Sequence, residues 1–386
     1  MIDCNCGNKQ PAIEDLIAPF SSVSLLGMCK NAGKTTTLNR LIGGIRQAGT
    51  TLALTSIGRD GESTDVVTGT VKPGIFVYTG TVFATSADLL RLCDVTKEML
   101  DVTPFRTPMG DVVIARALSD GFVQLAGPSL TTQIAEVAET FRSFGAEKTL
   151  VDGALERKSL GNGKVCDAAI LCTGASYNRN MDIVVRDTAF ICTLLGLPAT
   201  DTQVTPADTR YRLDAADGML CLSDETQPAP DGTVNAKYLP VAADGTLYVP
   251  KTKTLPEDLW SRQVKQDLSA WFDNLPADVK QSGFPAIYVQ GGLTDSMIRP
   301  LLTSGADLRG KTLLFKDGSR VLLSYDTCDK LRIKGLSFAV LDPIRLLCVT
   351  VNPFSAYGFH FDKDTFLTRM REAVPVPVYD VLADRA

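Results

Sequence analysis

One short segment of this sequence carries residues whose types and spacing suit phosphate binding. Gly33, Lys34 and Thr35 follow an apolar run at residues 22–26 and precede a helical pattern. A lysine in this position can neutralise the β- and γ-phosphate oxygens of a nucleotide, and the threonine hydroxyl can bind Mg²⁺. Backbone N–H groups at the start of the helix point toward the same anion, where the helix dipole adds about half a positive charge. The segment predicts a nucleotide-phosphate loop.

The residues that we assign to nucleotide binding are Gly27, Met28, Cys29, Lys30, Asn31, Ala32, Gly33, Lys34, Thr35 and Thr36. The common spacing G-x4-G-K-[ST] places its first glycine at position 28, where this chain has methionine, and Gly27 lies one residue early. Lys30 and Asn31 could reach the γ-phosphate, and a solvent-exposed loop lysine is the alternative for Lys30. Cys29 adjoins the helix start, where the pKa of a thiol falls, although a thiol without a role is the favoured interpretation.

Two carboxylates follow predicted strands and are candidates for magnesium binding. Asp152 comes directly after the apolar residues 149–151, and Asp60 lies shortly after the strand predicted at 51–56. In a doubly wound sheet the ligand sits at the carboxyl ends of the strands, so both carboxylates would face the phosphates. We expect Thr35, Asp60 and Asp152 around Mg²⁺, with Asp60 placing the attacking water. An ordinary turn aspartate is the alternative at both positions. The expected catalytic residues are Lys30, Lys34, Asp60 and Asp152.

Alternating apolar runs and helical patterns would position these residues. Strands are expected at 22–26, 51–56, 148–151 and 168–173. Leu38, Leu41, Ile42 and Ile45 recur at helical spacing after the loop, and residues 130–141 carry a second such pattern. The alternation predicts an α/β fold like that of P-loop NTPases, with a doubly wound, mostly parallel sheet and a second α/β domain toward the C-terminus.

A change in composition near Pro198 suggests the domain boundaries. We expect a nucleotide-binding domain at 1–200, an irregular or β-rich connecting segment at 201–285, and a C-terminal α/β domain at 286–386. In the last of these, strands are expected at 286–290, 313–315, 338–341, 346–351 and 378–382, with helices near 297–302 and 366–374.

Composition excludes several other classes of function. Of the 386 residues, 39 are Lys or Arg and 44 are Asp or Glu, which gives a net charge of −5 without long runs of one sign. Binding nucleic acid irrespective of sequence needs clustered basic residues, so we expect no nucleic acid partner. No apolar stretch approaches the roughly 18 residues that span a membrane, and no secretory signal is visible. The 10 cysteines are scattered, as in reducing compartments. We expect a cytoplasmic protein.

The chain resembles the SIMIBI class of P-loop NTPases, and more narrowly the P-loop reactivase subunit that accompanies adenosylcobalamin-dependent lysine 5,6-aminomutase. Three segments carry the resemblance: GMCKNAGKTT at 27–36, VDGALERK at 151–158 and TGASYNRNMD at 173–182. The resemblance implies an accessory ATPase that opens a mutase whose cobalamin has been inactivated. Arg157, Lys158 and the loop at 176–182 would then be coupling elements. The chain has no Asp-x-His-x-x-Gly cobalamin motif, so contact with the cofactor would be indirect.

Two rival functions stay open. One is an ATP-dependent small-molecule kinase or ligase of the dethiobiotin-synthetase type. The other is a nucleotide-dependent metal or cofactor insertion factor, for which Cys4, Cys6 and Cys29 would matter. ATP is the expected nucleotide, because no Asn-Lys-x-Asp motif supports guanine. A partner protein is expected, and a homodimer is plausible because related NTPases often dimerise over nucleotide.

Overall fold

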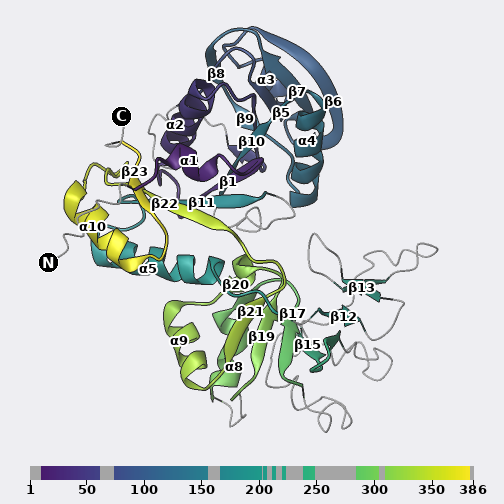
Figure 1. Cartoon of the computed structure of the whole chain (residues 1–386), viewed down its shortest axis with the longest axis vertical. Helices are drawn as coiled ribbons and strands as arrows, with labels where there is room; N and C mark the ends of the chain where they lie inside the picture. Colours follow the sequence, from purple (N-terminus) through teal and green to yellow (C-terminus); the bar gives the residue numbers. More distant parts are fainter. Residues whose placement is uncertain are drawn as a thin grey trace, which may run out of the picture. The chain divides into compact units, whose positions relative to one another are not determined.

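The computed structural model describes residues 10–60, 74–154, 166–201, 203–206, 211–213, 220–222, 238–247, 284–303 and 309–382. The chain forms two compact units: unit 1 comprises Met1–Cys192 and Arg345–Ala386, and unit 2 comprises Thr193–Ile344 (Figure 1). Unit 1 contains a large mixed sheet that is mostly parallel, and unit 2 contains a second mixed sheet. The chain is therefore an α/β protein.

Unit 1 is organised around nine strands in the order β23-β22-β11-β1-β10-β2-β5-β7-β6. Their bounds are β1 Ser22–Gly27, β2 Leu52–Ser56, β5 Val82–Ser86, β6 Lys97–Thr107, β7 Gly110–Ala117, β10 Lys148–Ala154, β11 Ala168–Gly174, β22 Leu346–Asn352 and β23 Val378–Asp380. Neighbouring strands from β23 to β5 pair in parallel, whereas β7 and β6 are antiparallel additions. The carboxyl ends of the parallel strands therefore share one edge.

The helices of unit 1 cover both faces of this sheet. Their bounds are α1 Ile13–Ile17, α2 Lys34–Gln47, α3 Ala87–Leu90, α4 Thr131–Ser143, α5 Met181–Leu195 and α10 Lys363–Ala373. The predicted apolar stripe of α2 is buried in one core with Leu54 of β2. Ala53, the preceding residue, packs in a second core with Phe141 of α4. Since successive strand residues point to opposite faces, α2 and α4 lie on opposite sides of the sheet.

Two short strand pairs complete the described part of unit 1. β3 Arg59–Asp60 pairs with β9 Leu125–Ala126, and β4 Ile75–Val77 pairs with β8 Gly121–Val123, both antiparallel. The first pair lies just beyond β2, so the chain after β2 is fixed to the segment before α4.

Unit 2 has a six-stranded sheet in the order β12-β16-β15-β17-β19-β21. The bounds are β12 Thr205–Pro206, β15 Tyr238–Val241, β16 Thr246–Leu247, β17 Ala286–Val289, β19 Thr312–Phe315 and β21 Ser337–Val340. β17, β19 and β21 are parallel, and helices α8 Asp295–Thr303 and α9 Tyr325–Ile333 connect them in sequence. Smaller elements are β13 Tyr211–Leu213 with β14 Leu220–Leu222, β18 Leu293–Thr294 with β20 Val321–Leu322, and the 3₁₀ helix η5 Gly318–Arg320.

The structure divides the chain at other places than the sequence suggested. We expected residues 286–386 to form one domain, but β22, β23 and α10 belong to unit 1. β22 pairs with β11 over its length, with Leu171 opposite Val349. The expected connecting segment at 201–285 supplies β12, β15 and β16 to the sheet of unit 2. An apolar run predicts a strand but does not say which sheet the strand joins, and this is why the boundaries differ.

Candidate functional site

The loop after β1 has a backbone that can receive an anion. β1 ends at Gly27 and α2 begins at Lys34. Between them, Asn31 (φ 61°) and Gly33 (φ 91°) adopt the left-handed conformation, and no other non-glycine residue in the described segments does so. A left-handed residue just before a helix turns successive N–H groups to one side, which makes a concave set of donors. The loop therefore offers its main chain to a negatively charged group.

Lys34 and Asp152, two of the predicted site residues, lie side by side. Lys34 Nζ is 2.9 Å from Asp152 Oδ1, and the two side chains are 14% and 4% exposed. Asp152 lies on β10 opposite Leu25 of β1 in the parallel register. The pairing of β1 with β10 thus places a carboxylate beside the start of α2. The result is a largely buried ion pair at the carboxyl edge of the sheet.

Gly27 explains how the lysine reaches this carboxylate. A Cβ atom at Gly27 would lie 2.7 Å from Lys34 Cδ and 2.9 Å from Lys34 Cγ. The aliphatic part of Lys34 therefore lies directly over the end of β1, in space that a larger residue would occupy. The glycine that stands one residue early in the motif has this packing role.

Met28 occupies the position where the common motif has glycine, and it anchors the loop. Its side chain is 7% exposed. Its N–H donates to Cys172 O of β11 at 2.9 Å, and its Sδ accepts a hydrogen bond from Thr188 Oγ1 of α5 at 3.1 Å. Met28 thus packs the loop against α5. The loop still has its left-handed residues, Asn31 and Gly33, before α2 although the first glycine of the motif is replaced.

The three threonines that begin α2 differ in their surroundings. Thr35 and Thr36 are half-buried, and within the described segments no residue bonds to either hydroxyl. Thr37 is fully buried; its hydroxyl donates to Gly33 O at 3.1 Å and lies 3.1 Å from the hydroxyl of Thr350. Thr37 therefore fixes the helix to β22, while Thr35 and Thr36 keep hydroxyls that a ligand can use.

The remaining loop residues contribute unevenly. The buried Nδ2 of Asn31 has no hydrogen-bond partner among the described residues, and a buried donor without a partner is costly. Lys30 is exposed at the loop surface. Cys29 is half-buried, and burial raises the pKa of its thiol to about 11. The expected fall in that pKa is wrong here, because loss of solvent around the thiol outweighs the helix terminus.

The other predicted carboxylate sites are only partly described. The backbone of Asp60 lies in β3, where it pairs with Leu125 of β9. The side chain of Asp60 lies outside the described structure, as do Cys4, Cys6, Glu156, Arg157 and Lys158. The roles of these residues therefore remain predictions.

Asn352 is a residue of this region that the sequence analysis did not select. It ends β22, and its Cβ lies 3.0 Å from where a Cβ on Gly33 would stand. Its O accepts the N–H of Ala175 at 2.9 Å, and its Oδ1 accepts the N–H of Phe354 at 3.1 Å. A polar residue directly after the strand predicted at 346–351 was a usable signal. We had assigned that strand to another domain.

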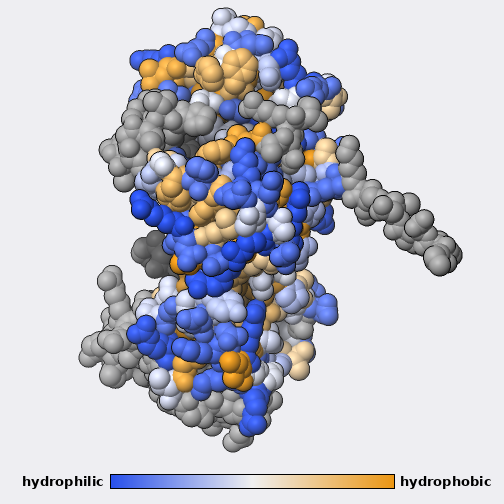
Figure 2. Space-filling view, turned by 90° about the vertical axis from the view of Figure 1, so that its left-hand side faces the viewer, coloured by the Kyte–Doolittle hydropathy of each residue, from blue (hydrophilic) through white to orange (hydrophobic). Residues whose placement is uncertain are grey.

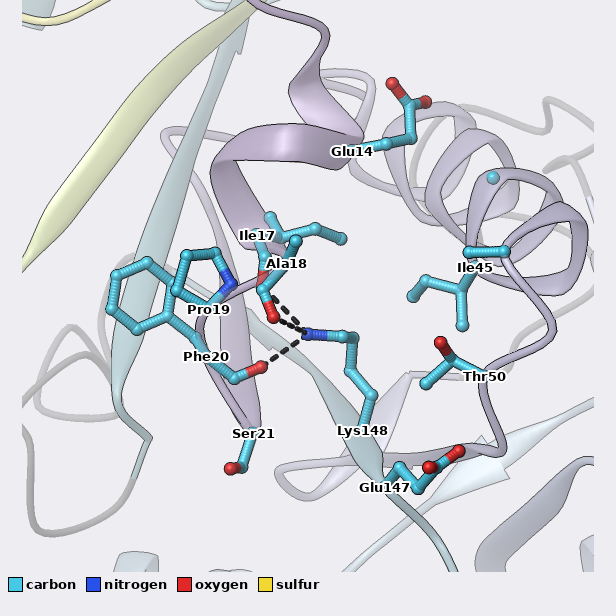
Figure 3. A pocket seen from close by; sticks show the side chains of 12 residues that line it. Glu14, Ile17, Ala18, Pro19, Phe20, Ser21, Ile45, Thr50, Glu147 and Lys148 are labelled. Carbon is cyan, nitrogen blue, oxygen red and sulfur yellow. Dashed lines mark hydrogen bonds between the residues drawn. The ribbon is translucent and has the colours of Figure 1, made fainter.

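A cavity of about 230 Å³ lies near the amino ends of β1 and β10, at the edge of the sheet opposite this loop. Figure 3 shows the residues that line it. Lys148, the first residue of β10, lines it and donates to Ile17 O at 2.8 Å, to Ala18 O at 3.3 Å and to Phe20 O. Burial lowers the pKa of this lysine. The ammonium group therefore secures the end of α1 to the sheet, and the cavity contains none of the predicted site residues.

Other features of the described segments add no second site of this kind. No group of three or more His, Cys, Asp or Glu side chains there could hold a metal ion. None of the helices in those segments is both long and apolar enough to cross a membrane. On the face that Figure 2 shows, hydrophilic residues are interspersed with small apolar patches. Searches of protein-family models, curated proteins and solved structures find no match to the chain.

Proposed function

We propose that this chain is a P-loop NTPase that binds the phosphates of ATP at residues 27–36 and hydrolyses ATP with Mg²⁺. The supporting observation is the placement of Lys34. It begins a helix, lies over a glycine at the end of a strand, and sits 2.9 Å from a carboxylate on the neighbouring strand. A lysine and a carboxylate at the carboxyl edge of a parallel sheet are the groups that phosphoryl transfer uses.

The loop residues suit a polyphosphate in three respects. The left-handed Asn31 and Gly33 turn main-chain donors inward. The orphaned Nδ2 of Asn31 would gain an acceptor from a phosphate oxygen. The ammonium group of Lys34 would exchange the carboxylate of Asp152 for phosphate oxygens. Phosphate oxygens would thus accept from the Nδ2 group of Asn31, which lacks an acceptor among the described residues, and from the ammonium group of Lys34, which otherwise pairs with Asp152.

The residues also suit Mg²⁺, an ion that prefers oxygen ligands and usually keeps several waters. The hydroxyl of Thr35 and the carboxylate of Asp152 would hold it, and phosphate oxygens would supply further ligands. With Lys34 drawn to the phosphates, the carboxylate of Asp152 is released toward the metal. Asp60 is the proposed group that orients the attacking water.

We further propose that hydrolysis serves a partner protein. The support is the resemblance to the reactivase subunit of adenosylcobalamin-dependent lysine 5,6-aminomutase, which makes a cobalamin enzyme the first partner to test. Unit 2 contains none of the predicted phosphate-loop residues, and we propose that it meets this partner.

Calorimetry of the full chain with Mg·ATP and Mg·GTP tests the nucleotide proposal. We expect binding of Mg·ATP in the parent protein and none in Lys34→Ala. Absence of heat with both nucleotides, or equal binding by the variant, would refute it. A pull-down from native lysate with and without ATP tests the partner. Recovery of a phosphorylated or ligated small molecule would instead favour a kinase or ligase.

A further inference from the structure

Helix α5 passes from one unit of the protein to the other. It runs from Met181 to Leu195, and the boundary between the units falls after Cys192. Most of the helix therefore belongs to unit 1 and its last turn to unit 2. Because an α-helix is bonded along its whole length, a shift at one end is carried to the other.

The part of α5 that belongs to unit 1 contacts the proposed phosphate loop at Thr188, in the middle of the helix. The Sδ atom of Met28 accepts from the hydroxyl of Thr188 at 3.1 Å. Both side chains are buried, at 7% and 0% exposure. Met28 is also held to β11 by its N–H, so a change in the loop that moves Met28 must act on β11 and α5.

The hydroxyl of Thr188 has more acceptors than protons. Val184 O, one turn back in the same helix, lies 2.7 Å away, Met28 Sδ lies 3.1 Å away, and the hydroxyl of Thr173 lies 3.0 Å away. A threonine hydroxyl donates one proton, and thioether sulfur is a weak acceptor. Thr188 can therefore bond to Met28 or back to its own helix, and the two choices define two states of this contact.

The end of α5 in unit 2 is packed just as closely. A Cβ atom on Gly318, the first residue of η5, would come closer to Leu194 O than atoms can approach. The chain that follows α5 then joins β21, because Val340 N–H donates to Pro198 O at 3.0 Å and Thr200 N–H donates to Val340 O at 2.8 Å. A shift of α5 therefore reaches η5 and β21.

We propose that Met28 and Thr188 form a relay that transmits the occupancy of the phosphate loop through α5 to η5 and β21 of unit 2. The inference rests on the proposed function, because it requires the loop to bind nucleotide. The proposal gives Met28, which stands where the common motif has glycine, a role in signalling. It also implies that the conformation of unit 2 depends on whether nucleotide is bound.

Hydrogen exchange measured by mass spectrometry on the full chain, with and without Mg·ATP, tests the relay. In the parent protein we expect nucleotide to change exchange in the last turn of α5 and in residues 316–340 by roughly fivefold or more, the lower range of typical coupling between sites. Thr188→Val should still bind Mg·ATP but lose the change in unit 2. Thr188→Ser, which keeps the hydroxyl, should retain it. Thr140→Val is the matched control, since the Thr140 hydroxyl bonds to Glu136 O on an exposed face of α4.

The outcomes separate the relay from the nucleotide proposal. Absence of Mg·ATP binding in the parent protein would refute the proposed function and the relay with it. Binding without any change in unit 2, or an undiminished change in Thr188→Val, would refute the relay alone. If Thr188→Val is unstable because Thr173 loses its partner, Thr173→Val/Thr188→Val removes both hydroxyls together and gives the same test.

Discussion

The ion pair between Lys34 and Asp152 makes a prediction about stability that needs no ligand. The two side chains are 14% and 4% exposed, so either charge would remain largely out of water after the other is removed. Removing one partner of a buried pair costs roughly 3–5 kcal/mol, and we take about 3 kcal/mol because Lys34 keeps some contact with solvent. We therefore expect Lys34→Met to lower the free energy of unfolding by about 3 kcal/mol.

A double-mutant cycle measured by urea denaturation checks this reasoning. The free energy of unfolding of Lys34→Met/Asp152→Asn should be about 1–2 kcal/mol higher than that of Lys34→Met, because the double variant no longer buries the carboxylate charge at position 152. Lys330→Met, at an exposed lysine of α9, is the control and should change stability by no more than about 0.5 kcal/mol. If Lys34→Met matches that control, and the cycle shows no coupling, the pair does not hold the loop to β10.

Three further predictions concern the same site. Gly27→Ala should displace the side chain of Lys34 and weaken Mg·ATP binding by about tenfold, roughly 1.4 kcal/mol by calorimetry. Gly43→Ala, at an open position of α2, is the control and should not weaken binding. Equal binding by the two variants would contradict the packing of Lys34 over Gly27. Asp60→Ala should leave Mg·ATP affinity unchanged and stop phosphate release, and continued release would remove Asp60 from the mechanism. Burial raises the pKa of the Cys29 thiol to about 11, so its alkylation, measured by peptide mapping, should be slow at pH 8 and become faster as the pH approaches 11. Fast alkylation of Cys29 at pH 8 would contradict the raised pKa.

The elements around the loop were predictable from sequence, because each is locally encoded. Residues 22–26 read as a buried strand and are β1, and the helical spacing of Leu38, Leu41 and Ile42 is the buried stripe of α2. The strand that carries Asp152 was also expected, and its pairing with β1 brings that carboxylate to Lys34. Local patterns were sufficient where the neighbours in sequence are also neighbours in space.

The contributions of distant segments were not predictable in the same way. Asn352 and Thr350 reach the loop only because β22 pairs with β11, a choice that the pattern of β22 does not encode. Met28 looked like a departure from the motif, and its contact with Thr188 depends on the packing of α5 over the loop. Side-chain packing between separate elements fixes these features, and hydrophobic periodicity does not report it.

The interrupted path of the chain through unit 1 has a consequence for synthesis on the ribosome. Domains commonly fold as their sequence emerges, the N-terminal part first. Here β22, the strand that supports Gly33 and Thr37, is made after all of unit 2. We expect a nascent chain that ends near residue 344 to have a folded unit 2 and an unfinished sheet in unit 1. The proposed phosphate loop would then gain the support of β22 only after the segment that follows unit 2 has been synthesised.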